Sequence, residues 1–338
     1  FKQKTAYEIR LSLVGSEMCI RDSYLTDGAV DNLQLTRGRA LRYGENPHQW
    51  GKFFTLDDDT ETFRVHQGKE LSYLNLLDAD GAWNTVIEFA DPTVVMVKHA
   101  NPSGIASRTN IDDAFQAAYD ADRLSAFGVI IAMNRECTGV IIDKILEQKM
   151  FVEIVLAPSY ESKALEKLKG KPNIRVLEMQ NMADKNCRTM YRSALCGMLV
   201  QELDTKVLTE KDLTVVTEKK PTAQQIADLL FAWNCVKHSK SNAIVFAKEK
   251  TTVGIGAGQT SRVDATWIAS KRAGEKAKGA VMASDAFFPF PDSLEEAAKV
   301  GISAVIQPGG SIKDADVIKR ANELGLTMVT TGTRAFWH

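Results

Sequence analysis

The sequence predicts an α/β fold divided into two lobes, each with strands covered by helices. From about residue 60 onward, short apolar and β-branched runs alternate with segments of helical periodicity. This alternation is typical of strands that are covered by helices. Residues 201–221 are rich in charge and end in a lysine pair before a proline, a composition that favours a boundary between two lobes.

The strands are predicted from the apolar runs that separate the helical patterns. Each run is short and lies between more polar segments. The predicted strands are Thr93–Lys98, Phe127–Met133, Val152–Leu156, Ala243–Ala247, Ala280–Ala283, Ala304–Ile306 and Thr327–Thr330.

Two segments between these strands have clear helical patterns. Residues 110–122 open with Asn110 as an N-cap and repeat apolar side chains on one face, namely Ile111, Phe115 and Ala118. Residues 221–238 begin with Pro221 near the first turn and predict a buried stripe of Ile226, Leu229, Leu230 and Trp233. Both segments are predicted to be surface helices packed against the sheet.

The chain is therefore divided into three parts. Residues 1–23 carry no usable periodicity and resemble adapter-derived readthrough, so we expect this segment not to be native. We place the first lobe at 24–205 and the second at 206–338. The phrases "MVKHANPSGI" and "CVKHSKSNAI" share three consecutive residues, and at that length coincidence explains the match better than a duplicated lobe.

Composition restricts the class of protein. The 338 residues carry 42 Lys and Arg against 43 Asp and Glu, a net charge of −1, so neither nucleic acid nor an anionic membrane is an expected partner. The longest apolar stretch, residues 126–133, is far short of a membrane span. The five cysteines form neither a CxxC pair nor a zinc spacing, which favours a reducing cytoplasm.

A lysine and a histidine follow the first predicted strand in "VKHANPSG", residues 97–104. Asn101 before Pro102 favours an extended, turn-initiating backbone, and Ser103 with Gly104 allows a tight exit from the strand. Loops at the carboxyl ends of strands are common ligand sites in open α/β sheets. A neutral imidazole can accept a proton and an ammonium can stabilise negative charge. The alternative is a solvated turn with two incidental polar side chains.

Three further stretches have the residue types of a ligand site. "LRYGENPHQ" (41–49) offers groups suited to a phosphate or an aromatic ring, although it could be a plain polar loop. "GIGAGQTSR" (254–262) resembles a phosphate cradle but lacks the P-loop lysine and the dinucleotide glycine spacing. "SDAFFPFPD" (284–292) could stack a flat ligand, or it could be core packing.

Taken in order, these stretches closely resemble the transformylase region of the bifunctional AICAR transformylase/IMP cyclohydrolase family. Matching pieces also include "GKELSYLNLLDAD" (68–80), "SAFGVIIAMNRE" (125–136), "KSNAIVFAK" (240–248), "QPGGSIKDADVI" (307–318) and "TGTRAFWH" (331–338). The resemblance implies two cytidine-deaminase-like three-layer lobes, with mixed sheets covered by helices. It also implies formyl transfer from 10-formyltetrahydrofolate, the co-substrate, to the 5-amino group of AICAR without a catalytic metal.

The resemblance assigns roles to individual residues. His99 would accept the proton from the amine, Lys98 would stabilise the oxyanion or protonate the leaving folate nitrogen, and Asn242 would orient the reacting groups. The implied AICAR contacts are Arg42, Tyr43, Gly128, Glu153, Arg262, Phe287 and Arg334. The implied folate contacts are Val263, Asp292, Ser311 and Ile312. At Glu153 the family has an aspartate, so that contact is the exception to the pattern.

Two rival functions are weighed against formyl transfer. A zinc deaminase needs an HxE pair and a PCxxC pair, and the sequence has neither. A noncatalytic nucleotide-binding protein is disfavoured by the joint presence of Lys98, His99 and Asn242. We expect a homodimer with shared active sites, as the family implies. Too few residues precede "LRYGENPHQ" to build the family's cyclohydrolase domain, so we expect no closure of formyl-AICAR to IMP by this chain.

Overall fold

The computed structural model describes residues 35–55, 62–180 and 189–338. The chain divides into two compact units, residues 1–61 and 62–338. The expected non-native segment, residues 1–23, lies outside the described residues.

In the first unit, the described residues form a hairpin. Strand β1 (Thr36–Ala40) pairs antiparallel with β2 (Lys52–Thr55). The connecting loop is closed at its base by Leu41, which donates its backbone N–H to the Gly51 carbonyl at 3.0 Å. A second backbone bond joins the Gly44 N–H to the Gln49 carbonyl at 2.7 Å. The predicted ligand loop 41–49 is therefore a closed hairpin loop.

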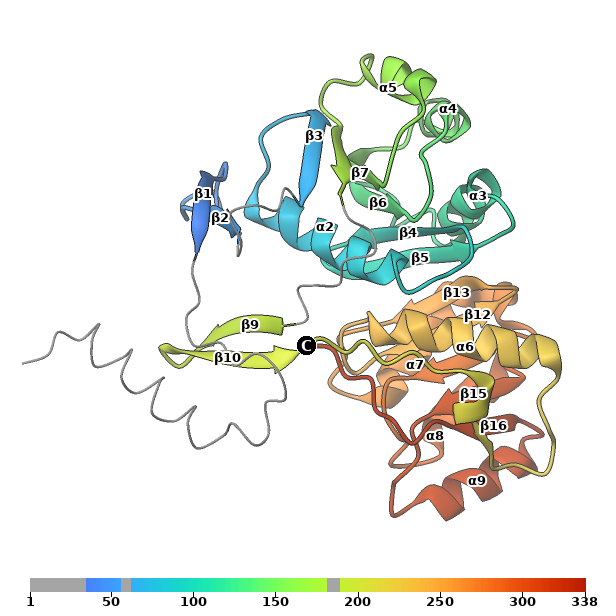
Figure 1. Ribbon diagram of the computed structural model, residues 1–338. Coiled ribbons are helices and arrows are strands. Elements are labelled where there is room, and N and C mark those ends of the chain that lie inside the picture. Colours follow the sequence, from blue (N-terminus) through green and yellow to red (C-terminus); the bar gives the residue numbers. More distant parts are fainter. Residues whose placement is uncertain (1–34, 56–61, 181–188) are drawn as a thin grey trace, which may run out of the picture. The chain divides into compact units, whose positions relative to one another are not determined.

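The second unit is built on a 12-stranded mixed sheet (Figure 1). Its strand order is β11-β16-β15-β14-β12-β13-β5-β4-β6-β7-β8-β3. The strands are β3 (Phe63–Gln67), β4 (Thr93–Lys98), β5 (Asn101–Ser107), β6 (Val129–Met133), β7 (Val152–Ala157), β8 (Arg175–Met179), β11 (Thr214–Val215), β12 (Ile244–Lys248), β13 (Thr251–Gly256), β14 (Val281–Ser284), β15 (Ala304–Gln307) and β16 (Thr327–Thr330).

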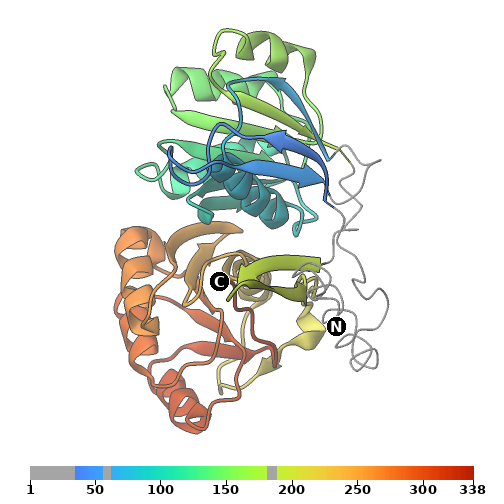
Figure 2. The ribbon, with the colours of Figure 1, turned by 90° about the vertical axis from the view of Figure 1, so that its left-hand side faces the viewer.

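Helices cover both faces of this sheet. They are α2 (Tyr73–Val86), α3 (Ile111–Ala121), α4 (Gly139–Glu147), α5 (Ser162–Leu168), α6 (Ala223–Lys237), α7 (Arg262–Ala273), α8 (Asp292–Lys299) and α9 (Asp314–Glu323), with short 3₁₀ turns at Glu210–Asp212 and Gly274–Ala277. Figure 1 shows α6 lying across the strands of the second half, and Figure 2 shows α7, α8 and α9 along one side of it. A separate antiparallel hairpin joins β9 (Thr189–Ala194) to β10 (Gly197–Glu202).

The sheet has the same strand order in its two halves, read outward from the β5–β13 pair. The first half runs β5-β4-β6-β7-β8-β3 and the second runs β13-β12-β14-β15-β16-β11. In each half a hairpin is followed by parallel strands and ends in an antiparallel edge strand. The two VKH phrases do not mark this repetition, because one ends β4 and the other ends helix α6.

Each half has its own hydrophobic core. One cluster joins β4, β6 and β7 to helices α3, α4 and α5, and the other joins β12, β14 and β15 to α7, α8 and α9. Side chains alternate between the two faces of a strand, so the intervening residues face α2 or α6. Strand β6 is buried at every position, which explains its unbroken apolar run. The α/β class with a mixed sheet covered by helices is confirmed, while the lobe boundaries stay a prediction.

The predicted strands are each present, with ends shifted by at most two residues. The predicted helix 110–122 is also present, and the Asn110 side chain accepts the Asp113 N–H as its N-cap. The second predicted helix begins instead at Ala223, capped by Thr222. Its predicted stripe is only partly correct: Leu229 and Trp233 are buried, whereas Ile226 and Leu230 are half-buried.

The expected loop over residues 97–104 is wrong in extent. Only His99 and Ala100 form the turn, and Asn101–Ser107 returns as strand β5 beside β4. Gly104 is needed within that strand because a Cβ there would lie 2.2 Å from the Ala118 carbonyl oxygen of α3. Gly104 therefore allows the strand to pack closely on the helix. In the sequence alone, a glycine with this role looks the same as a glycine in a turn.

Candidate active site

Most of the residues that the sequence singles out lie along one edge of the large sheet, namely the side on which strands β4, β14, β15 and β16 end. In the second half, Asn242 precedes β12, whereas the segments 284–291, 307–313 and 331–338 follow the parallel strands β14, β15 and β16. In the first half, β4 runs antiparallel to β6, so Lys98 and His99 lie beside the start of β6. The antiparallel pairing of β5 with β13 brings these two sets to the same edge.

The turn that carries His99 has an unusual backbone. His99 and Ala100 have φ values of 54° and 55°, as the two central residues of a tight two-residue hairpin turn do. For residues other than glycine, this left-handed conformation costs about 1–2 kcal/mol each. The surrounding structure must therefore hold the turn in place. His99 itself is exposed and Lys98 is half-buried.

Lys98 reaches toward the start of β6. Its ammonium donates a hydrogen bond to the Phe127 carbonyl at 2.6 Å and lies 6.0 Å from the centroid of the Phe127 ring. The next residue, Gly128, has φ 75° and donates its N–H to the Phe151 carbonyl at 2.7 Å. Lys98 and Gly128, predicted separately, are thus brought together.

Asn101 joins the His99 turn to the loop that carries Asn242. Its side-chain oxygen accepts the backbone N–H of Lys240 at 3.0 Å, and its amide nitrogen donates to the His99 carbonyl at 3.2 Å. Sequence reasoning did not assign Asn101 to the site, because the Lys240 contact depends on a pairing between distant strands. Burial lowers the pKa of the Lys240 side chain, with a smaller contribution from Arg192.

Asn242 and Arg262 belong to a buried polar cluster. Arg262 donates to the Asn242 side-chain oxygen at 2.6 Å, to the Ser284 hydroxyl at 2.9 Å and to the Asp285 carboxylate. The Asp285 side chain is fully buried, and its carboxylate also accepts the Ala243 N–H at 3.1 Å and the Ser241 hydroxyl. The guanidinium is thereby fixed and largely neutralised by a buried carboxylate. Sequence reasoning missed Asp285, although it lies in the predicted motif 284–292.

A cavity of about 260 Å³ opens beside the His99 turn. Lys98, His99 and Asn101 line part of its wall, and Asp122 and Arg272 are among its other lining residues. Arg272 and Asp122 form an ion pair with 3.6 Å between their charged atoms. Ligand sites usually have volumes of roughly 300–1,000 Å³, so this cavity matches part of a substrate in size.

Glu153 is held in an ion pair. It is the extra residue of a bulge between β6 and β7, and its carboxylate lies 2.7 Å from the guanidinium of the buried Arg175. Arg175 also donates to the Glu70 carbonyl at 3.1 Å. The glutamate that replaces the family's aspartate therefore has a partner within this chain.

The other predicted site residues come from several separate segments of the chain. Arg42 stacks over the Tyr43 ring at 4.5 Å and donates to the Tyr43 hydroxyl, both within the first unit. Arg334 lies 4.4 Å from the centroid of the Phe336 ring. Phe287 and Ile312 are exposed. The remaining residues lie in segments that border the second half of the sheet: Val263 in the first turn of α7, Asp292 at the start of α8 and Ser311 after β15.

The described parts of the chain contain neither a cluster of metal-binding side chains nor a helix that could span a membrane. No three His, Cys, Asp or Glu side chains there cluster closely enough to hold a metal ion. No described helix combines the length and apolar character needed to cross a membrane.

Comparisons with known proteins agree with the sequence motifs. The model of the AICARFT/IMPCHase bienzyme family matches residues 1–272. The bifunctional purine biosynthesis protein PurH of Bacillus cytotoxicus is 45% identical over 342 residues, covering 100% of this chain and 66% of the relative. The corresponding PurH of Acetivibrio thermocellus is 48% identical, covering 94% and 63%, and that of Bacillus cereus strain B4264 is 50% identical, covering 100% and 66%. The chain thus spans just under two thirds of the length of these curated relatives.

Proposed function

Because the chain belongs to the AICARFT/IMPCHase bienzyme family, we propose that it acts in purine biosynthesis as an AICAR formyltransferase. The reaction moves a formyl group from 10-formyltetrahydrofolate to the 5-amino group of AICAR. A bond forms between the amine nitrogen and the formyl carbon, and the bond from that carbon to the folate nitrogen breaks. The products are formyl-AICAR and tetrahydrofolate.

The proposed chemistry needs one group that accepts a proton from the amine. It also needs one that stabilises the oxyanion or donates a proton to the folate nitrogen. In this proposal the His99 imidazole takes the proton from the attacking amine. The Lys98 ammonium stabilises the tetrahedral oxyanion or protonates the departing folate nitrogen. Their position as neighbours at one strand end supports this pairing. The Lys98 bond to the Phe127 carbonyl at 2.6 Å leaves an ammonium with further N–H donors for the substrate.

The observation that supports the proposal most directly is the bond between Asn101 and Lys240, at 3.0 Å. It joins the Lys98–His99 turn to the loop of Asn242, so three residues proposed as catalytic border one sheet edge. In the proposal, Asn242 orients the reacting groups from a position fixed by Arg262.

The substrates are assigned to the remaining residues. Arg42, Tyr43, Gly128, Glu153, Arg262, Phe287 and Arg334 are proposed to bind AICAR, and Val263, Asp292, Ser311 and Ile312 the folate. A cavity of about 260 Å³ is smaller than a site for two such molecules needs. The proposal includes a homodimer, as the family implies, in which a second copy contributes part of each site. Arg42 and Tyr43 of one copy would face the Lys98–His99 turn of the other.

The proposal also covers the type of lobe, the cellular compartment and the need for a metal. The two halves of the sheet, which share one strand order, are proposed to be the two cytidine-deaminase-like lobes that the family implies. The protein is proposed to work in the cytoplasm, without a catalytic metal.

An assay of the purified chain tests this function. AICAR and 10-formyltetrahydrofolate should give tetrahydrofolate, seen by absorbance, and formyl-AICAR, seen by mass spectrometry, with an unchanged rate in the presence of a chelator. Activity should fall on dilution below the dimer dissociation constant. Binding of AICAR without any tetrahydrofolate release would instead support a noncatalytic nucleotide-binding protein.

A further inference from the structure

Helix α2 carries a carboxylate that the proposed function does not use. The family motif at residues 68–80 contains Asp78, which is 8% exposed. The helix begins with a capping box in which Ser72 and Asn75 exchange backbone and side-chain hydrogen bonds of 3.1 and 3.3 Å. This cap fixes the start of α2 and hence the position of Asp78 one and a half turns later.

Asp78 binds the backbone of the His99 turn. Its Oδ1 accepts the Ala100 N–H at 2.7 Å. Burial raises the pKa of the Asp78 carboxyl, while hydrogen bonds from the Ala100 and His99 backbones and the nearby His99 side chain act in the opposite direction. A buried carboxylate that accepts the N–H groups of a left-handed turn gives a hydrogen-bond partner to donors that would otherwise be unpaired.

We infer that Asp78 is a positioning residue for His99: it holds the turn so that the exposed imidazole faces the cavity of the active site. The inference rests on the proposed function, because it assigns Asp78 a role in the same reaction. Small displacements of a catalytic group are costly to turnover. His99 is exposed, so the position of its backbone decides where its imidazole lies.

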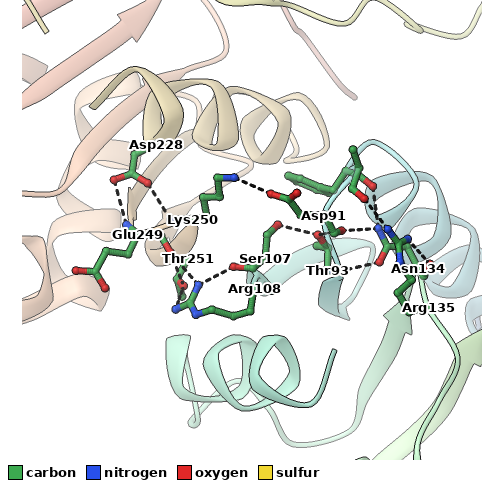
Figure 3. A network of polar contacts seen from close by, with 12 residues as sticks. Asp91, Thr93, Ser107, Arg108, Asn134, Arg135, Asp228, Glu249, Lys250 and Thr251 are labelled. Atoms are coloured by element: carbon green, nitrogen blue, oxygen red, sulfur yellow. Dashed lines mark hydrogen bonds and ion pairs between the residues drawn. The ribbon is translucent and has the colours of Figure 1, made fainter. Parts of the chain in front are cut away.

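The second half of the sheet contains the same arrangement without the proposed catalytic residues. Asp228 occupies the sixth position after the α6 N-cap Thr222, as Asp78 does after Ser72. Its carboxylate accepts the N–H groups of Glu249 and Lys250 at 3.1 and 2.8 Å, and this turn also has φ values of 51° and 50°. Figure 3 shows Asp228 reaching this turn, and the contacts of Lys250 with Asp91 beside it.

Asn242 lies just before the start of β12, and the β12–β13 turn lies at its other end. The two are therefore at opposite ends of the strands of the sheet. Asp228 is therefore a matched control. The same substitution at either position removes a buried carboxylate from an equivalent turn, and only one of the two turns carries His99.

The test compares Asp78→Ala, Asp78→Asn and Asp228→Ala in the formyl-transfer assay. We expect Asp78→Ala to lower kcat roughly 10- to 100-fold, with the KM for AICAR within about threefold of the wild type because substrate contacts are kept. Asp78→Asn keeps an oxygen that accepts the Ala100 N–H, so it should retain most of the turnover. Asp228→Ala should lower the melting temperature about as much as Asp78→Ala and leave kcat within about twofold.

A second comparison keeps the inference testable if Asp78→Ala is poorly folded. Glycine adopts φ values near 55° without steric cost, so Ala100→Gly should restore part of the lost kcat in the Asp78→Ala background. Hydrogen exchange of the Ala100 amide gives a readout independent of turnover: its protection should fall in Asp78→Ala and stay unchanged in Asp228→Ala.

The outcomes separate this inference from the function itself. Absent turnover in the wild type would overturn the proposed function, while loss of Ala100 protection in Asp78→Ala would still support the hold on the turn. With an active wild type, equal kcat in Asp78→Ala, an equal loss in Asp228→Ala or no rescue by Ala100→Gly would overturn the positioning role.

Discussion

Lys240 donates its backbone N–H to the side-chain oxygen of Asn101 at 3.0 Å. Asn101 directly follows the His99 turn, and Lys240 lies two residues before Asn242. The bond therefore connects a strand of the first half of the sheet to a loop of the second half, at the edge that carries the candidate active site.

Replacing Asn101 tests this connection. Asn101→Ala removes the acceptor of the Lys240 N–H and the donor to the His99 carbonyl, so we expect a loss of about 1–3 kcal/mol in unfolding free energy and a roughly tenfold lower kcat. Asn101→Asp keeps an acceptor and should retain more of both. Urea unfolding and the formyl-transfer assay measure these effects, and wild-type turnover in Asn101→Ala would contradict the proposed link.

The pair of Arg262 and Asp285 should contribute strongly to folding. Asp285→Ala leaves the 8%-exposed Arg262 side chain without its carboxylate, and removing one partner of a buried ion pair costs about 3–5 kcal/mol. Glu275→Ala, which breaks an exposed pair with Lys278, is the control and should leave the denaturation midpoint unchanged. Similar midpoints for the two variants would contradict the importance of this buried pair.

Gly104 should not accept a side chain. A Cβ at this position would lie 2.2 Å from the Ala118 carbonyl oxygen, so Gly104→Ala must separate β5 from α3 and should cost about 1–3 kcal/mol. At Gly170 the nearest atom to an added Cβ is 3.4 Å away, an ordinary contact. Thermal unfolding should therefore show a lower melting temperature for Gly104→Ala and almost none of this effect for Gly170→Ala.

The Asp78 carboxyl should make stability depend on pH. Burial raises its pKa in the folded protein above the usual value for an aspartate, so the folded state holds the proton more tightly than the unfolded chain. Its contribution therefore becomes less favourable as the pH rises from about 4 through the folded pKa. Unfolding free energies at several pH values should decrease more steeply over this range for the wild type than for Asp78→Asn. Parallel curves would contradict the prediction.

The regular elements of the fold could be predicted because their signals are local. The apolar run 129–133 is buried at every position, and Asn110 caps its helix as its residue type predicts. Strand β5 could not be predicted in the same way. Pro102 and Gly104 resemble turn residues in sequence, and the reason for Gly104 lies in its contact with Ala118, which depends on the folded arrangement.

The candidate site was predictable as separate motifs and not as contacts. Arg262 and Asp285 lie in two stretches that the sequence singles out, and their pairing depends on β12 lying beside β14. The hydrogen bond between Asn101 and Lys240 depends in the same way on the β5–β13 pairing. Asp78 was part of a recognised motif, but its role follows from the position of α2 over the His99 turn.

The most direct test of the account measures turnover and AICAR binding together in His99→Ala. If the imidazole accepts the proton from the amine, kcat should fall by ~10²–10⁴, while the Kd for AICAR, measured by calorimetry, should change by less than about threefold. A His99→Ala protein with wild-type kcat, or with equal losses in binding and turnover, would contradict the assignment of His99 as the proton acceptor.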